Sequence, residues 1–138
     1  MSLITEATKI ISLPILKNLD QNRTNPQKFQ ERWFQKLVKR GSKTLFGKEH
    51  GIFSGMNYTQ FSSNIPLHTY DMVEPYINRI RAGERDVLWD RPITQFAKSS
   101  GTSSSKSKFI PITKESLRYC HYAGMTKMVL TYVNNNPK

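Results

Sequence analysis

The chain has 138 residues, 37% of them hydrophobic, and a formal net charge of +11 at pH 7. This size and apolar content fit one globular domain with a packed core. No apolar run approaches the ~20 residues of a membrane-spanning helix, and a single cysteine excludes an internal disulfide.

The histidines and the cysteine do not suggest a metal or nucleophile site. His50, His68 and His121 are scattered along the sequence, which argues against a metal centre. Cys120 is expected to be a small buried side chain, and a lone cysteine fits a reducing compartment. The first residues have neither the basic start nor the cleavage site of a signal peptide. We therefore expect a soluble cytoplasmic protein without a membrane partner.

About half of the net positive charge lies in residues 1–49. Basic side chains spread along helices usually form a solvated face. A net charge of this size is also typical of proteins that bind nucleic acid. RNA-stacking surfaces place aromatic residues between basic ones on a strand face, and the sequence lacks that pattern. A non-catalytic basic module that binds RNA or another polyanion is therefore kept as the alternative interpretation.

Two helices are predicted in the first third of the chain. Residues 3–20 have apolar side chains at helical spacing, and Pro14 is expected to bend or split this helix. Packing of this stripe against the rest of the protein is favoured over membrane anchoring. The second helix is predicted from Pro26, directly after the capping residue Asn25, to near Gly41. The two apolar faces consist of Ile4, Ala7, Ile11, Ile15 and Leu19, and of Phe29, Trp33, Leu37 and Val38.

The rest of the chain alternates loops with short elements. Glycines indicate a loop region around residues 47–55, followed by a short helix at 59–63. Asp71 and Glu74 have the spacing of a capping box and predict a helix that ends at Gly83, with Pro75 in its first turn. Strands are predicted at 92–97 and 108–112, the second at an edge because of Pro111. A long helix is predicted from Thr113 to about Val133. The pattern indicates a helix-rich α+β fold with a short hairpin-like pair of strands.

The segment between the two predicted strands carries the main functional signal. It reads Ser99-Ser100-Gly101-Thr102-Ser103-Ser104-Ser105 and is followed by Lys106 and Lys108. Small residues let the backbone bend closely around a ligand, hydroxyls and amides donate hydrogen bonds, and lysines supply positive charge. A polyphosphate needs this combination. A flexible linker is the alternative, but strand patterns at both ends and charges of one sign argue against it.

The common P-loop is excluded, because Gly101 is the only glycine in the segment. Its order of strand, Ser-Ser-Gly-Thr-Ser, basic exit and strand resembles the phosphate-binding loop of the acyl-adenylate-forming enzymes. It is most similar to the auxin-responsive promoter (Gretchen Hagen three) family of acyl acid–amido synthetases, particularly the bacterial branch. The segments FGKEHGI (46–52), IPLHTYDMVEPYINRIRAGERDVLW (65–89) and PITQFAKSSGTSS (92–104) also resemble this family's N-terminal region.

The resemblance extends from about Pro26 to the last residue and implies a function. The chain would be the ATP-binding N-terminal part of a ligase that activates a carboxylic acid as an acyl-adenylate and transfers the acyl group to an amino acid amine. Lys108 falls at the catalytic lysine of the family motif and would neutralise phosphate charge. Arg118 or Lys127 would meet the carboxylate of the acyl substrate. The ATP phosphates would contact Ser99, Ser100, Gly101, Thr102 and Ser103, with Lys106 as a weaker candidate.

Adenylation also needs parts that the resemblance places outside residues 1–138. These are the carboxylate ligands of Mg²⁺, an adenine-stacking aromatic residue and a C-terminal lobe. No acidic residue lies between Asp90 and Glu115, so no metal ligand is expected in the loop, and this also disfavours an unrelated phosphotransferase. Residues 1–138 are therefore expected to form an incomplete N-terminal part of a large adenylate-forming domain, inactive alone. Its partners would be the acid, the amino acid and the remainder of its own polypeptide. Ser104 and Ser105 stand where many family members have glycines, which predicts a stiffer loop or more side-chain contacts with phosphate.

Overall fold

A computed structural model of the chain describes residues 3–99 and 107–136, with side chains described from residue 10 onward. The chain divides into two compact units, one formed by residues 1–30 and 115–138 and the other by residues 31–114. Both are rich in helix, and the second contains a two-stranded antiparallel sheet. The predicted helix-rich α+β fold is confirmed. None of the helices in the described ranges has the length and apolar content needed to cross a bilayer.

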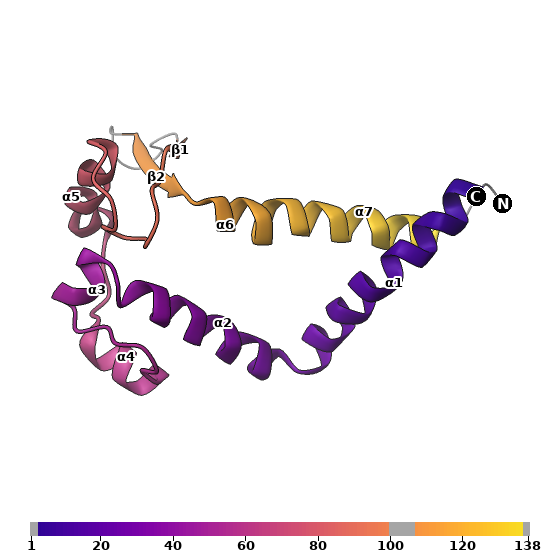
Figure 1. Ribbon diagram of the computed structural model, residues 1–138, viewed down its shortest axis with the longest axis horizontal. Coiled ribbons are helices and arrows are strands. Elements are labelled where there is room, and N and C mark those ends of the chain that lie inside the picture. The colour runs from indigo at the N-terminus through magenta and orange to yellow at the C-terminus, as the bar shows by residue number, and fades with distance from the viewer. Residues whose placement is uncertain (1–2, 100–106, 137–138) are drawn as a thin grey trace. The chain divides into compact units, whose positions relative to one another are not determined.

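The first unit is built from helices that lie near the two ends of the chain. Helix α1 (Leu3–Thr24) packs against α7 (Ala123–Asn135), as Figure 1 shows. A π-helical segment, η1 (Leu117–Tyr122), directly precedes α7. Helix α1 continues through Pro14 without interruption, so the predicted split does not occur.

Most of the helical run η1–α7 is exposed to solvent. Its large apolar side chains with the greatest exposure are Tyr122, Met125, Met128 and Tyr132. Cys120 is also exposed, so the expectation that it is buried is wrong. The reason is that α1 covers only one side of this run within the unit, which leaves the other faces without cover.

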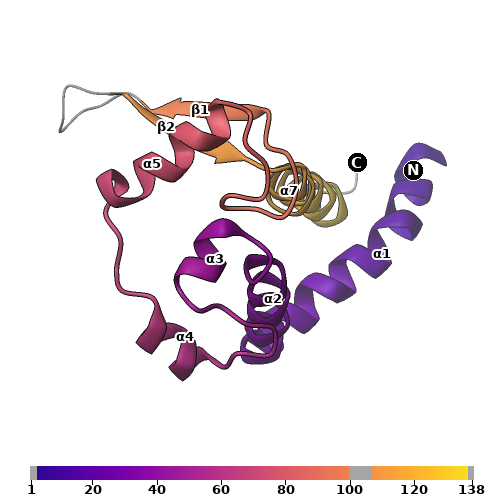
Figure 2. The same ribbon diagram turned by 60° about the vertical axis from the view of Figure 1, so that its left-hand side comes forward.

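The second unit contains most of the regular elements. They are α2 (Pro26–Gly41, whose first residues belong to the other unit), α3 (Leu45–Glu49), α4 (Tyr58–Asn64), α5 (Tyr70–Arg81), β1 (Gln95–Ser99) and β2 (Lys108–Ile112). The short helix α6 (Lys114–Ser116) follows β2 and leads into η1. Figures 1 and 2 show α5 beside the hairpin of β1 and β2. The buried apolar side chains of this unit are Val38, Met56, Ile77, Ile80 and Val87.

A tight turn joins α2 to α3 at the centre of this unit. The buried Thr44 hydroxyl donates to the Gly41 carbonyl (2.7 Å) and accepts from the Gly47 amide (3.0 Å). A Cβ at Gly47 would lie 1.9 Å from the Gly41 carbonyl oxygen, so glycine is required there. The amides of Leu45 and Phe46 donate to the carbonyls of residues 86 and 87. These bonds join the loop after α5 to the first turn of α3.

Several predicted boundaries agree with the structure and others are wrong. Helix α2, strand β2 and the helix end at Gly83 lie where predicted. Helix α5 begins at Tyr70 with Thr69 as its N-cap and no side-chain capping bond, so the predicted Asp71–Glu74 capping box is absent. Pro75 consequently lies beyond the first turn. Strand β1 spans Gln95–Ser99 rather than 92–97, because one-for-one antiparallel pairing with β2 selects these five residues.

Candidate functional site: the end of the β hairpin

The hairpin brings together the two described ends of the predicted phosphate loop. Ser99 pairs with Lys108 in the register of the two strands, and Lys98 pairs with Phe109. Residues directly opposite in an antiparallel pair share a face, and successive pairs alternate between faces. Ser99 and Lys108 therefore lie side by side on one face, at the rung where the chain enters and leaves the loop. Both are half-buried.

The remaining loop candidates, Ser100, Gly101, Thr102, Ser103 and Lys106, lie outside the described residues, as do Ser104 and Ser105. Their contacts with phosphate stay a prediction. Ser99 is the last residue of β1 and not a loop residue, because the strand reaches further toward the loop than predicted.

Helix α5 supports the loop exit from outside the hairpin. The Tyr70 hydroxyl accepts a hydrogen bond from the Phe109 amide (2.8 Å) and donates to the Phe109 carbonyl (3.3 Å). The Lys108 ammonium lies 5.3 Å from the centroid of the Tyr70 ring, and the Arg81 guanidinium lies 4.0 Å from that of the Phe109 ring. Both separations are within the range of a cation–π interaction. Tyr70 and Arg81 were not predicted, because the contacts join segments 39 and 28 residues apart.

The charged side chains of the hairpin strands are positive. Lys98 and Lys108 are the charged residues of β1 and β2, and Lys114 lies two residues beyond the end of β2. Neither strand contains an acidic residue. Among the described residues, no group of three or more His, Cys, Asp or Glu side chains is close enough together to hold a metal ion. The charge pattern is compatible with an anionic ligand at the loop.

Arg118 and Lys127, the predicted contacts of the acyl substrate, belong to the other unit. Arg118 is exposed on η1, with its guanidinium 5.5 Å from the centroid of the Tyr119 ring. Lys127 is half-buried on α7, where its carbonyl accepts from the Thr131 hydroxyl. They are about two and a half turns apart along the same helical run, so the structure does not bring them together.

A second cluster lies around α3. The Phe46 ring stacks on His50 with centroids 4.0 Å apart, and it makes T-shaped contacts with the rings of His68 and Tyr76. The Nε2 atoms of His50 and His68 are 3.2 Å apart. The Tyr76 hydroxyl donates to Glu49 at 2.5 Å, and this hydrogen bond, with burial, raises the pKa of Tyr76. Sequence spacing did not suggest this pairing of histidines, because the chain turns back between them.

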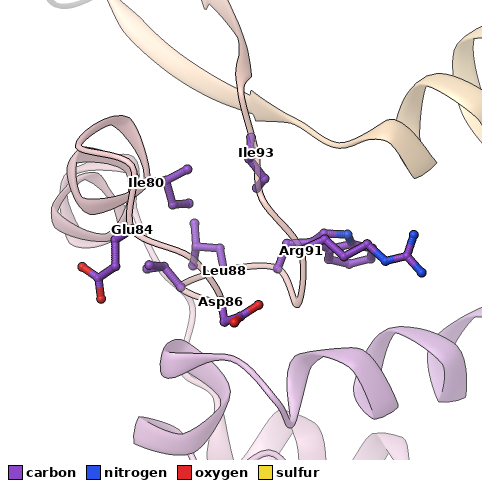
Figure 3. Close-up of a pocket in the computed structure, with 8 residues that line it drawn as sticks. Ile80, Glu84, Asp86, Leu88, Arg91 and Ile93 are labelled. Atoms are coloured by element: carbon purple, nitrogen blue, oxygen red, sulfur yellow. The ribbon is translucent and has the colours of Figure 1, made fainter.

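A small hollow lies beside the C-terminal end of α5 (Figure 3). In that view the Glu84 and Asp86 carboxylates lie on one side, and the Arg91 guanidinium points away from them. It encloses essentially no free volume, whereas ligand pockets usually measure ~300–1,000 Å³. The hollow is therefore too small for a nucleotide. The lining residues are Ile80, Glu84, Asp86, Val87, Leu88, Trp89, Arg91 and Ile93.

Comparison with known proteins shows the family to which the chain belongs. The model of the GH3 family N-terminal domain matches residues 15–138. Indole-3-acetic acid-amido synthetase GH3.2 of Arabidopsis thaliana is 30% identical over 116 residues, which are 83% of this chain and 21% of that protein. Jasmonoyl-L-amino acid synthetase JAR4 of Nicotiana attenuata is 30% identical over 117 residues, which are 83% of this chain and 20% of that protein.

A solved structure supports the same relationship. GH3.15 acyl acid amido synthetase matches this chain with a TM-score of 0.73 and 30% sequence identity, over 85% of this chain and 21% of that one. The chain thus spans about a fifth of the length of the relatives it matches. Because the family model covers residues 15–138, the chain belongs to the GH3 family, and these residues correspond to its N-terminal domain.

Proposed function

We propose that this chain is the ATP-binding N-terminal part of an acid–amino acid ligase, from the bacterial branch of the family and within the acyl-adenylate-forming superfamily. Residues 1–138 would form an incomplete part of the large domain. The observation that carries the proposal is the opposition of Ser99 and Lys108 at the end of the hairpin. These two paired residues flank the hydroxyl-rich segment in the sequence, and Lys108 supplies a cation on its C-terminal side.

The proposed reaction is the attack of a substrate carboxylate on the α-phosphorus of ATP. An acyl-adenylate forms, pyrophosphate leaves, and an amino acid amine then takes the acyl group and releases AMP. The main obstacle is repulsion between the negative carboxylate and the negative phosphates, so preorganised donors on the leaving pyrophosphate lower the barrier. Lys108 would neutralise phosphate charge. Ser99, Ser100, Thr102, Ser103 and the weaker candidate Lys106 would donate hydrogen bonds, and Gly101 would allow close approach of the backbone.

Other parts of the site would lie elsewhere. Arg118 or Lys127 would contact the acyl substrate. Mg²⁺ would offset phosphate charge when bound, with ligands supplied from outside this chain. A cytoplasmic location is part of the proposal and rests on the single cysteine, which fits a reducing compartment.

The test uses the full-length enzyme that contains this chain. Mg·ATP binding is measured directly, and ATP–pyrophosphate exchange is measured with indole-3-acetic acid and jasmonic acid, the acids indicated by the names of the relatives. Lys108→Ala and Ser100→Ala are each expected to lower exchange by about tenfold or more, which is ~1.4 kcal/mol or above. Unchanged Mg·ATP binding and exchange in both variants would contradict the proposal.

Lys98→Ala is the matched control. Lys98 is an exposed lysine one rung from Lys108, and the strand alternation places it on the other face of the hairpin. Its loss changes net charge by the same amount as Lys108→Ala, so a general electrostatic effect would appear in both variants. Only a specific role of Lys108 leaves Lys98→Ala close to wild type.

A further inference from the structure

The hairpin that carries the loop depends on support from outside. Isolated two-stranded sheets are marginally stable at best, and β1 and β2 have five residues each. Within the second unit, α5 packs on β2. Helix α5 is itself held in the core by the buried Ile77 and Ile80. The position of β2 relative to the core is therefore set through α5.

Tyr70 makes this connection at the loop exit. Its hydroxyl accepts from the amide and donates to the carbonyl of one residue, Phe109, so the hydroxyl acts as acceptor and donor at once. A Phe109 amide that donates to Tyr70 points away from β1. The hydroxyl thus pairs with β2 at its open edge, at the position that a third strand would otherwise occupy.

The same side chain also orients the adjacent lysine. The Lys108 ammonium lies within cation–π range of the Tyr70 ring, and the guanidinium of Arg81, at the other end of α5, stacks on the Phe109 ring. Phe109 is therefore held through its backbone by one end of the helix and through its ring by the other. This leaves Lys108 little freedom to turn away from the rung that it shares with Ser99.

We propose that Tyr70 is a positioning residue that holds Lys108 and the loop-exit backbone in register for the β- and γ-phosphates of ATP. The inference rests on the proposed function of the loop. It deepens that function, because it predicts that the contribution of Tyr70 is specific to the polyphosphate part of the nucleotide and absent for its adenosine part.

The experiment compares the dissociation constants of Mg·ATP and AMP in the full-length enzyme. Tyr70→Phe keeps the ring and removes the hydroxyl. It is expected to weaken Mg·ATP binding by about three- to tenfold or more, because loss of a single hydrogen bond already produces this range and both bonds to Phe109 are lost. AMP lacks the β- and γ-phosphates, so its binding is expected to change by less than about twofold. Amide exchange at Phe109 is expected to accelerate in the same variant.

Tyr76→Phe is the matched control. It makes the same chemical change on the same helix, but the Tyr76 hydroxyl donates to Glu49 and not to β2. Binding of both nucleotides should match wild type. In a Lys108→Ala background, Tyr70→Phe should have much less effect on Mg·ATP binding, because the lysine that Tyr70 positions is missing.

The outcomes separate this inference from the proposed function. Wild-type Mg·ATP binding in Tyr70→Phe, with weak binding in Lys108→Ala, would overturn the inference and leave the function standing. Equal losses for Mg·ATP and AMP would show a merely structural role and would also overturn it. Wild-type Mg·ATP binding in Tyr70→Phe, Lys108→Ala and Ser100→Ala, with unchanged exchange in the last two, would overturn the inference and the proposed function together.

Discussion

The Nε2 atoms of His50 and His68 face each other at 3.2 Å, while both Nδ1 atoms lie next to backbone carbonyl oxygens. The distances from Nδ1 to oxygen are 2.9 Å for His50 and 2.6 Å for His68. A carbonyl oxygen only accepts, so a hydrogen bond at either Nδ1 has the imidazole as its donor. This pair joins α3 to the segment that leads into α5.

The first prediction concerns the coupling between these histidines. His50→Gln and His68→Gln should each destabilise the region around α3, and the double variant should lose less than the sum of the two. The expected coupling is about 0.5–1.5 kcal/mol, typical of one hydrogen bond in a partly buried site. Hydrogen exchange of peptides from residues 44–52 in the full-length enzyme measures it. Additive losses would show that the two rings do not interact.

The second prediction concerns the turn between α2 and α3. Gly47→Ala should destabilise the second unit by at least ~2 kcal/mol, because the new Cβ would lie 1.9 Å from the Gly41 carbonyl oxygen and backbone must move. Gly124→Ala is the control, since Gly124 lies inside the helical run η1–α7 and nothing lies within 4 Å of the position that its new Cβ would take. Alanine there should raise stability by about 0.5–1 kcal/mol. Hydrogen exchange of the segments around Gly47 and Gly124 measures the stability change in each variant. Equal protection of residues 44–52 in wild type and Gly47→Ala would contradict the structure of this turn.

Local signals in the sequence predicted some of these elements well. The Asn25 side chain accepts from the Lys28 amide, and Gly41 ends the same helix, so α2 could be predicted at both ends. Helix α4 extends the predicted 59–63 by one residue at each end, and its actual capping box uses Asn57 and Gln60. Such signals lie within a few residues of the boundary that they determine.

Features that depend on distant contacts could not be predicted in this way. The start of β1 is set by its register with β2, and the support at Phe109 comes from Tyr70, 39 residues away. Helix α3 has five residues, and its first amides bond to residues 86 and 87, so the region around Gly47 looked like a loop. The candidate site itself was predicted from composition. The hydroxyls, the glycine and the lysines suit a phosphate group by their chemistry, and this does not depend on the residue at which the strand ends.

The third prediction concerns acid pH and the end of α5. Arg79 and Glu84 form a two-point ion pair, and this hydrogen bonding from Arg79 lowers the pKa of Glu84 below its ordinary value of 4.5. A lowered pKa in the folded state means that the contribution to stability is present above about pH 4.5 and is lost as pH falls through the folded value. Both side chains are largely exposed, so the effect should be small and screened by salt.

Carboxyl-carbon NMR of glutamate-labelled enzyme measures the Glu84 titration, with Glu84→Gln to assign the signal. The midpoint should lie below 4.5 and return toward it in Arg79→Gln or at high salt. A midpoint that does not move in Arg79→Gln would show that the pair does not form in solution.

The fourth prediction concerns alkaline pH and the contact between α5 and α3. The hydrogen bond from the Tyr76 hydroxyl to Glu49, followed by burial and the negative charge of Glu49, raises the pKa of Tyr76 above its ordinary value of 10.0. The raised pKa belongs to the folded state. The contribution of Tyr76 to stability is therefore complete below about pH 10 and is lost as pH rises through the folded value. Glu49→Gln keeps a hydrogen-bond acceptor but removes the charge, so the Tyr76 titration should shift back toward 10.0.

Tyrosine-labelled NMR follows the titration, and Tyr76→Phe assigns the signal. Because Tyr76 and Tyr70 lie on the same helix, this titration also tests whether loss of the Tyr70 hydroxyl disturbs the contact between Tyr76 and Glu49. Tyr70→Phe should leave the Tyr76 titration midpoint unchanged. A change in that midpoint would mean that α5 moves as a whole when its link to β2 is lost.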